Sequence, residues 1–416
     1  MLNIVGVILA ASAILMSISL HEAGHLMAAK ALGMRATRFF VGFGPTLWSI
    51  RRRGTEYGVK AIPLGGFVAI TGMAVHDEDA DHPRAMWRFP VWKRTIVMAA
   101  GSAVHFLLGF LIFWAIAATA TVPNPANAGP LVPGDRVLAQ PAFVRVAPCV
   151  DADLGTAQRC GSDDGPGWLA GLRDGDRIIR LGERPVSTYG DLVDAVRSLP
   201  AGQPAPVDYV RDGTTRHTTI RPVPARRPPA DDPDGAPIPV VVVGLGLGFD
   251  PALPRTVEYN AAEAVPVAAS WFGEIGSGVV ASVRTLPEKI PGLWRSITGG
   301  KRDPRSPVSV VGASRISGEF FSTGNYTAMF SSIAALNIFI GLFNLLPLLP
   351  LDGGHVAIAW FDKLRARLHA RRGRPDPGPV NTGKLLPLTY TVTAIFIAFT
   401  LFTVAADIVN PISLVK

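Results

Sequence analysis

The chain has 416 residues, of which 48% are hydrophobic and 17% are charged, and its formal net charge is +8. Its mean hydropathy is positive although it contains 43 glycines and 36 prolines. A composition this apolar, and this unevenly distributed along the chain, excludes an ordinary soluble globular protein, and the length allows two or three domains.

Four apolar segments are long enough to cross a bilayer, which takes about 20 helical residues. We expect transmembrane helices within residues 1–32, 93–122, 328–354 and 385–410. The first segment lacks the positively charged start and the clear cleavage site of a secretory signal peptide. A retained span is therefore favoured over a cleaved leader, and the expected fold is a polytopic α-helical membrane protein.

The placement of lysine and arginine predicts how these helices are oriented. Basic residues cluster after the first span, at Arg51–Arg53, and between the third and fourth spans, at Lys363–Arg374. Short basic loops stay in the cytoplasm, so residues 33–92 and 355–384 are predicted to be cytoplasmic and residues 123–327 to lie outside. This asymmetry accounts for most of the net charge. Nucleic-acid binding is therefore not indicated, and the basic loops could instead contact anionic lipid.

The cytoplasmic segment 33–92 is predicted to be a membrane-associated β region. Apolar residues alternate over residues 35–73, and turn-forming residues occur at Gly42–Pro45, at Arg53 and Gly54, and at residues 65 and 66. This pattern predicts short strands and a hairpin. The apolar flanks indicate that the hairpin dips towards the membrane, which such backbone tolerates only if it is buried in protein or lines a wet cavity.

The outside segment divides by composition. Residues 130–223 predict a small α+β domain, because turn formers separate short strands from an amphipathic helix at about residues 189–199. Residues 224–239 are rich in proline and predict a linker. Residues 256–323 predict an amphipathic segment on the membrane surface, with no chemistry assigned to it.

Both cysteines of the chain, Cys149 and Cys160, fall in this outside segment. An oxidising compartment favours a disulfide between them. Two unpaired thiols are the alternative.

The end of the first span carries ionisable residues in the pattern H-E-x-x-H. His21 and His25 are one helical turn apart and face the same side, so their ring nitrogens can converge on one zinc ion. Glu22 lies beside them and can act as a general base towards water. Ionisable groups within membrane spans are costly without partners, which favours a chemical role over a purely structural one.

Two histidines leave such a site one protein ligand short, because a catalytic zinc ion usually has three protein ligands and one open position. Asp352, in the stretch "PLDGG", is the lone carboxylate near the cytoplasmic end of the third span. The predicted topology puts it at the depth of the first span's end, so it is the candidate third ligand. Pro347, Pro350 and the following glycines predict a broken backbone there. A helix cap at the membrane surface is the alternative role for Asp352.

Four motifs together resemble the site-2 protease family, and within it the bacterial RseP-like branch with one PDZ domain. They are HExxH in the first span, P-L-G-G-F in the β region, "GLRDGDRII" in the outside domain, and a late N-x-x-P-x-x-P-L-D-G. The resemblance covers nearly the whole chain. It implies four transmembrane helices, a membrane-associated β-hairpin and an extracytoplasmic α+β PDZ-like domain. It also implies an intramembrane zinc metalloprotease that cuts transmembrane segments of other proteins.

The family motifs also imply roles for single residues. By motif match, His21, His25 and Asp352 take the Zn²⁺ ligand roles and Glu22 takes the role of catalytic base. Asn344 matches the family's asparagine before the double-proline segment, which implies contact with the substrate or with the tetrahedral intermediate.

Substrate binding is predicted at the hairpin that contains Gly65, Gly66 and Phe67. A substrate helix must be unwound before it is cut, and an edge strand at residues 67–71 could hold it extended by main-chain pairing. A hairpin that only shapes the cavity is the alternative.

One motif departs from the family pattern. Relatives usually carry a G-P-x-x-N-F-like motif in the second span, whereas this chain has "GSAVHF", with His105 in place of the asparagine. His105 could donate a hydrogen bond in its place, lie close to the metal, or simply pack.

The resemblance further implies single-span membrane protein substrates, such as anti-sigma factors, that have already been cut outside the cell. It implies a bacterial inner membrane location, and a PDZ-like domain that either binds the new terminus or excludes bulky substrates. Two other functions compete with proteolysis. A non-catalytic receptor or scaffold is disfavoured because the motif residues are intact, and a zinc transporter is disfavoured because the ionisable residues gather at one depth.

Overall fold

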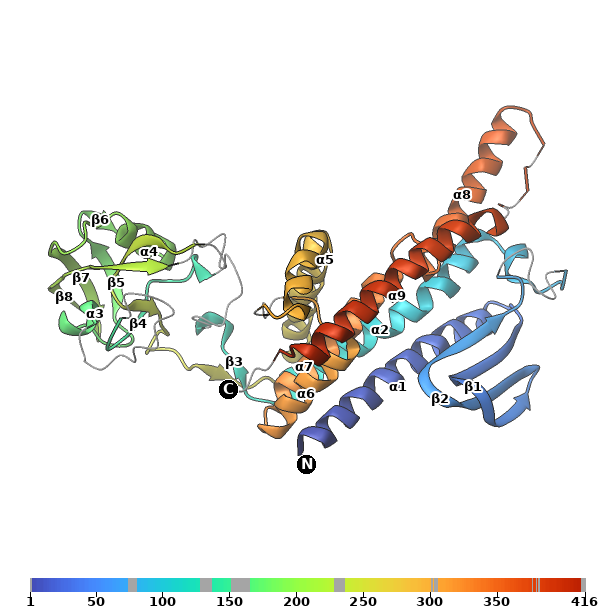
Figure 1. The fold of residues 1–416 in the computed structure, drawn as a ribbon, viewed down its shortest axis with the longest axis horizontal. Coiled ribbons are helices and arrows are strands. Elements are labelled where there is room, and N and C mark those ends of the chain that lie inside the picture. The colour runs from blue at the N-terminus through green and yellow to red at the C-terminus, as the bar shows by residue number, and fades with distance from the viewer. Residues whose placement is uncertain are drawn as a thin grey trace. The chain divides into compact units, whose positions relative to one another are not determined.

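The computed structural model divides the chain into two compact units (Figure 1). The first unit comprises Met1–Ala120 and Tyr259–Lys416, and the second comprises Thr121–Glu258. Leu64 and Thr382 are described by their backbone alone. The described residues are 2–73, 81–127, 137–150, 165–227, 236–300, 302, 306–375, 377, 378, 380 and 382–412.

Long apolar helices dominate the first unit. Within its described residues these are α1 (Leu2–Ala31), α2 (Val91–Thr119), α5 (Ala264–Ile297), α6 (Val310–Ser322), α7 (Tyr326–Asn344), α8 (Asp352–Arg371) and α9 (Leu386–Val409), with short 3₁₀ turns η1 (Met86–Arg88) and η5 (Thr382–Leu385). In the described part of the chain, five helices are long and apolar enough to cross a membrane, namely α1, α2, α5, α7 and α9. This is the architecture of a multi-pass membrane protein. The fifth candidate is α5, where we expected only a surface segment, so the predicted count of four spans is not confirmed.

Small residues let these helices approach one another closely. On α1, a Cβ at Gly6 would lie 2.8 Å from the Cα of Gly318 on α6. On α2, a Cβ at Gly109 would lie 2.9 Å from Ile338 of α7. Small residues at helix contacts are typical of membrane bundles, where close backbone approach replaces the hydrophobic effect. Helix α2 thereby packs between α1 and α7.

The β region of the first unit consists of β1 (Ala36–Arg52) and β2 (Thr55–Ile70), which pair antiparallel. The turn between them contains Arg53 and Gly54, both with positive φ (48° and 78°). Phe40 lies opposite both Gly58 and Phe67, so the first half of β1 contacts both ends of β2. At the Phe67 end of β2 the N–H of Val68 bonds to Glu22, so this part of the strand lies beside α1.

The two other expected turns are also present, although they lie within the bounds of β1 and β2. Residues 38–41 run parallel to residues 56–59, which pair antiparallel with residues 46–52, so the chain reverses direction near Gly42–Pro45. Residues 36–41 pair antiparallel with residues 66–70, so the chain reverses again between residues 60 and 66, where Gly65 has φ 115°. The β region therefore turns at all three predicted places.

The third predicted span is interrupted, as its prolines suggested. Helix α7 ends at Asn344, and α8 begins at Asp352 rather than continuing it. Residues 345–351, which contain Pro347 and Pro350, form a tight connection. A Cβ at Gly353 would collide with the carbonyl oxygens of Leu345 and Leu346, so glycine permits the return of the chain.

The second unit is an α+β domain around a four-stranded sheet. The strands lie in the order β6 (Arg184–Pro185), β5 (Arg177–Leu181), β7 (Ala205–Arg211) and β8 (Thr214–Ile220). The core of the domain contains buried apolar residues of the sheet, including Ile178, Val207 and Ile220, and of helix α4 (Tyr189–Arg197), including Leu192. A capping box between Thr188 and Asp191 begins α4. The elements are β3 (Val122–Pro123), η2 (Pro125–Asn127), β4 (Val144–Val146), α3 (Pro166–Leu169), β5 (Arg177–Leu181), β6 (Arg184–Pro185), α4 (Tyr189–Arg197), β7 (Ala205–Arg211), β8 (Thr214–Ile220), β9 (Val223–Arg227), β10 (Ile238–Val242), β11 (Leu245–Leu247) and β12 (Thr256–Val257).

The linker predicted at residues 224–239 is wrong at both of its ends. Strand β9 pairs with β10 across this stretch, so that Ala225 lies opposite Val240. The proline content hid the strands, because proline is tolerated in a two-stranded ribbon wherever its missing N–H is not needed for pairing. Residues 228–235 lie outside the described part of the chain.

Candidate metal centre

The second half of α1 presents two histidines on one face. His21 and His25 are four residues apart in an unbroken helix, and both side chains are buried. A helix repeats every 3.6 residues, so side chains at this spacing stack one above the other. The Nε2 atoms of the two rings lie 3.0 Å apart.

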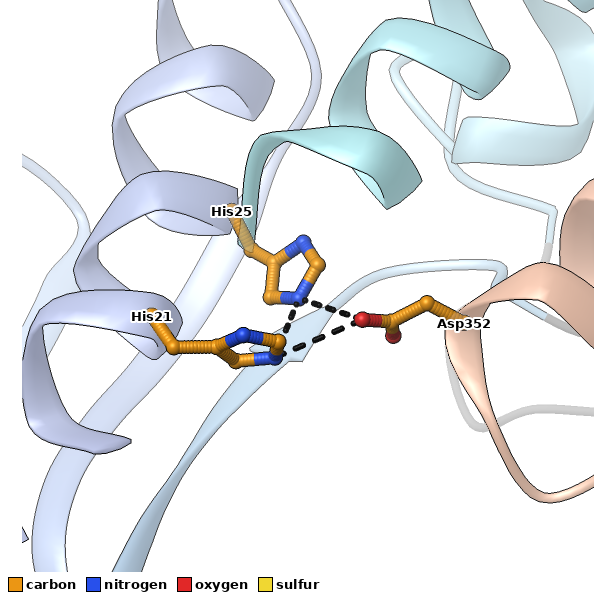
Figure 2. A group of neighbouring side chains, drawn as sticks. All are labelled: His21, His25 and Asp352. Atoms are coloured by element: carbon orange, nitrogen blue, oxygen red, sulfur yellow. Dashed lines mark hydrogen bonds and ion pairs between the residues drawn. The ribbon is translucent and has the colours of Figure 1, made fainter. Parts of the chain in front are cut away.

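Asp352 reaches the same point from the first residue of α8. Its Oδ2 atom lies 3.3 Å from the Nε2 of His21 and 3.3 Å from the Nε2 of His25. Figure 2 shows the three side chains converging from two different helices. In the part of the chain that the structure describes, this is the one group of histidine, cysteine and acidic residues close enough together to hold a metal ion.

The donor set fits zinc. Two imidazole nitrogens and one carboxylate oxygen are ligands that zinc prefers, and donors sharing one tetrahedral zinc ion lie roughly 3.3–3.6 Å apart, given bond lengths of about 2.0–2.2 Å. The three observed separations are close to these values. His25 Nδ1 bonds to the carbonyl oxygen of Val97 at 2.7 Å, which places the proton on Nδ1 and leaves Nε2 with a lone pair for a metal.

Helix α2 leaves room for the two imidazole rings because it carries a glycine opposite them. A Cβ at Gly101 would lie 2.5 Å from the Nε2 of His25 and would also collide with the ring of His21. No side chain larger than hydrogen fits at this position while the rings stay where they are. Gly101 and the Val97 carbonyl are functional features that our sequence reasoning missed.

Glu22 lies beside the two histidines and is held by the β region. Its Oε2 atom accepts a hydrogen bond of 3.0 Å from the backbone N–H of Val68 in β2. Within the described residues its other oxygen, Oε1, accepts no hydrogen bond. The strand thus fixes one carboxylate oxygen and leaves the second available for a proton.

The predicted substrate-binding residues occupy two places. Gly65, Gly66 and Phe67 lie in β2 directly before Val68, and a Cβ at Gly66 would lie 3.7 Å from Cγ of Glu22. Asn344 is the last residue of α7. No hydrogen bond between described residues links its side chain to the three candidate ligands.

His105 of α2 lies close to the metal centre. Its ring centroid is 5.0 Å from that of His21, and its Nδ1 atom lies 2.9 Å from Oδ1 of Asn337 on α7. The sequence singled out His105 but not Asn337, which stands within an apolar helix and has no motif around it.

The structure describes only one of the two cysteines of the predicted disulfide. Cys149 is disulfide-bonded. Cys160 lies outside the described residues, so the pairing of the two cysteines stays a prediction.

Comparison with known proteins identifies the family of this chain. The sequence profile of peptidase family M50 matches residues 9–375. The zinc metalloprotease Rip1 of Mycolicibacterium smegmatis is 41% identical to this chain over 420 residues, which cover 99% of this chain and 98% of Rip1. The zinc metalloprotease Rip1 of Mycobacterium tuberculosis is 40% identical over 418 residues, which cover the whole of both chains.

A more distant relative shows the same chemistry in its name. The metalloprotease MmpA of Caulobacter vibrioides is 28% identical over 372 residues, which cover 84% of each chain. The family profile spans both the histidines of α1 and Asp352. The chain therefore belongs to peptidase family M50, the site-2 protease family, and is an intramembrane zinc metalloprotease.

Proposed function

We propose that His21, His25 and Asp352 hold the zinc ion of this enzyme and that Glu22 is its general base. The observation that carries the proposal is the convergence of three donor atoms, 3.0–3.3 Å apart, from two helices at opposite ends of the sequence. Buried groups of this kind, without a metal, would crowd lone pairs against a carboxylate in an apolar bundle.

Zinc, when bound, supplies Lewis acidity, which makes water a nucleophile near neutral pH and polarises the peptide carbonyl. Glu22 then takes the proton of the attacking water on Oε1 and later delivers it to the leaving amine. The Val68 N–H holds Oε2, so the carboxylate keeps one orientation through both transfers. This hydrogen bond therefore restricts rotation of the Glu22 carboxylate before the reaction begins.

The substrate is proposed to bind beside β2. Residues 66–70 pair with β1 on one edge, and Val68 turns its N–H away from that edge, towards Glu22. A peptide laid along residues 65–67 would therefore enter next to the catalytic base. Main-chain pairing accepts any unwound segment, which suits a protease that cuts different transmembrane helices.

The setting of the reaction is also a proposal. We propose that the β region and the metal centre lie near the cytoplasmic face of the bacterial inner membrane. The Arg51–Arg53 cluster and the basic residues of α8 support this orientation. The second unit is then extracytoplasmic, with residues 130–223 as a PDZ-like domain that selects substrates by a new terminus or by size. Its sheet, helix α4 and buried apolar core support a small peptide-binding domain of this kind.

The substrates are proposed to be single-span membrane regulators, such as anti-sigma factors, that another protease has already cut outside the cell. Such a substrate is short on the outer side, so it can reach a centre buried among helices. The enzyme then makes the second cut and releases a cytoplasmic fragment.

The catalytic assignment is tested by Glu22→Gln. We expect co-expression with a truncated single-span substrate to give at least about 10²-fold slower cleavage than the wild type, because the base is lost. Bound zinc should stay at the wild-type level, because the side chain at position 22 is not one of the proposed ligands. Equal rates of substrate loss with the wild type and with Glu22→Gln would refute the proposal.

A second variant tests the ligand set. We expect Asp352→Ala to lose both zinc and cleavage, as measured by metal analysis of the purified protein in detergent. Wild-type zinc content in this variant would remove Asp352 from the centre.

A further inference from the structure

His21 carries a buried ring nitrogen that lacks a partner. Its Nε2 faces His25 and Asp352 (Figure 2), whereas its Nδ1 has no hydrogen-bond partner among the described residues. An imidazole that binds zinc through one nitrogen keeps its proton on the other, and that N–H almost always donates to an acceptor. His25 follows this rule through the Val97 carbonyl. His21 does not.

The unpartnered nitrogen faces helix α2. A Cβ at Gly101 would lie 2.6 Å from His21 Nδ1, so this nitrogen points at the turn of α2 that contains Gly101. His105 lies one helical turn further along the same face. Its ring is 1% exposed, and its centroid is 5.0 Å from that of His21.

Asn337 determines which nitrogen of His105 carries the proton. The side-chain N–H of Asn337 donates to the carbonyl oxygen of Ile333 at 2.9 Å, which turns Oδ1 of the amide towards His105. Oδ1 can only accept, so Nδ1 of His105 donates to it across 2.9 Å. The neutral ring therefore has its lone pair on Nε2. His105 is thus a buried acceptor beside a buried donor.

We propose that His105 is a positioning residue for the metal centre, accepting the Nδ1–H of His21 on its Nε2. The inference rests on the proposed ligand role of His21. Two imidazoles that share an N–H···N bond of about 2.9 Å have centroids about 5 Å apart. The observed centroid separation of 5.0 Å therefore allows the bond once the two nitrogens face each other. The chain Asn337–His105–His21 then fixes the tautomer of the ligand and makes its Nε2 a better donor to the metal.

Ser102 offers the competing acceptor. Its hydroxyl is also on α2, is fully buried, and has no hydrogen-bond partner in the part of the chain that the structure describes. A hydroxyl can accept from His21 as an imidazole can. An experiment on His105 must therefore include Ser102→Ala.

The test measures how fast full-length protein in detergent loses zinc to an excess of chelator. His105→Met and His105→Gln form a matched pair, since the two side chains have similar size but only glutamine has an acceptor near the position of Nε2. We expect His105→Met to lose zinc at least about tenfold faster than the wild type, within the range for loss of an outer partner. His105→Gln should stay within about threefold of the wild type.

Asn337→Leu provides a second route that leaves His105 in place. Without the Asn337 acceptor, His105 can carry its proton on either ring nitrogen. We therefore expect this variant, like His105→Met, to lose zinc faster than the wild type. Combined with His105→Met it should add little, because Asn337 acts through His105. Additive effects in the double variant would contradict the proposed chain.

Other outcomes are equally clear. Wild-type zinc retention by His105→Met overturns the proposal, and so does equal zinc loss by the methionine and glutamine variants, which would indicate packing alone. Faster loss in Ser102→Ala with wild-type retention in His105→Met assigns the acceptor to Ser102 instead. Wild-type zinc in a His21→Ala variant would refute the proposed ligand set itself, which distinguishes the two failures.

Discussion

Val97, Gly101 and His105 lie on one face of α2 at intervals of four residues, and that face meets both histidines of α1. The Val97 carbonyl accepts the Nδ1–H of His25, and Gly101 leaves space for the two rings. The contact between α1 and α2 therefore determines how the two imidazole rings are oriented. Rings that are held in place before the metal binds lose less freedom when it does.

Gly101→Ala tests the space that α2 leaves. The added methyl group would overlap both imidazole rings, so we expect zinc to dissociate at least about tenfold faster, comparable with the loss of an outer partner. Chelator competition on the purified protein measures this rate. Gly273→Ala on α5 is the matched control, because nothing lies within 4 Å of a Cβ there. Equal zinc retention by the two variants would show that the rings adjust at no cost.

Side-chain chemistry decided which parts of this site could be predicted. His21, Glu22, His25 and Asp352 are polar groups in apolar surroundings, and such groups are visible in a sequence because they are costly. The Val97 contribution is a backbone carbonyl, which every residue has. Gly101 is one of 43 glycines, and only the neighbouring helix shows why it must be small.

Strand β2 connects two tasks at the level of elements. Its residues before Val68 form the proposed substrate edge, and the Val68 N–H holds Glu22. On the proposed roles, a peptide that shifts this strand also shifts the base. The hydrogen bond from the Val68 N–H to the Glu22 carboxylate would then couple substrate binding to proton transfer.

Val68→Pro removes this hydrogen bond without removing a metal ligand. We expect kcat to fall roughly tenfold or more, since Glu22 loses its anchor, and bound zinc to stay unchanged. Val68→Ala keeps the N–H and serves as the control. A kcat for the proline variant equal to that of Val68→Ala would show that the strand does not orient the base.

Element boundaries were harder to predict than the elements themselves. Helices α1, α2 and α9 were predictable because their apolar runs are continuous. Helix α5 was not, since Pro287 and Pro291 stand within it and its apolar residues mix with polar ones. Strands β9 and β10 were hidden by proline, and only their pairing with each other reveals them.

A buried ion pair and the hydrogen bonds around it connect α5, α6 and α9 within the first unit. Arg302 and Asp407 lie 2.6 Å apart, with side chains only 2% and 3% exposed. Ser309, at the start of α6, donates its N–H and hydroxyl to Asp407 on α9. Asn410, next to the end of α9, donates to the carbonyl oxygen of Ser296 in α5. The end of α9 is therefore attached to both α5 and α6.

Asp407→Ala would leave the Arg302 guanidinium buried and unpaired. We expect it to lower the free energy of unfolding of the detergent-solubilised protein by about 3–5 kcal/mol. Asp194→Ala breaks the exposed pair with Arg197 and should change the free energy of unfolding by less than about 1 kcal/mol. Similar values for the two variants would show that the buried pair does not hold α9 in place.

The distance along the chain between the histidines of α1 and Asp352 has a consequence for synthesis. The ribosome completes α1 and α2 early, but the third donor follows only after α7 and its tight connection have been made. With the proposed ligand set, the growing chain has only two of the three donors until then. A site assembled in this order would become complete only after most of the protease's own helices have been made.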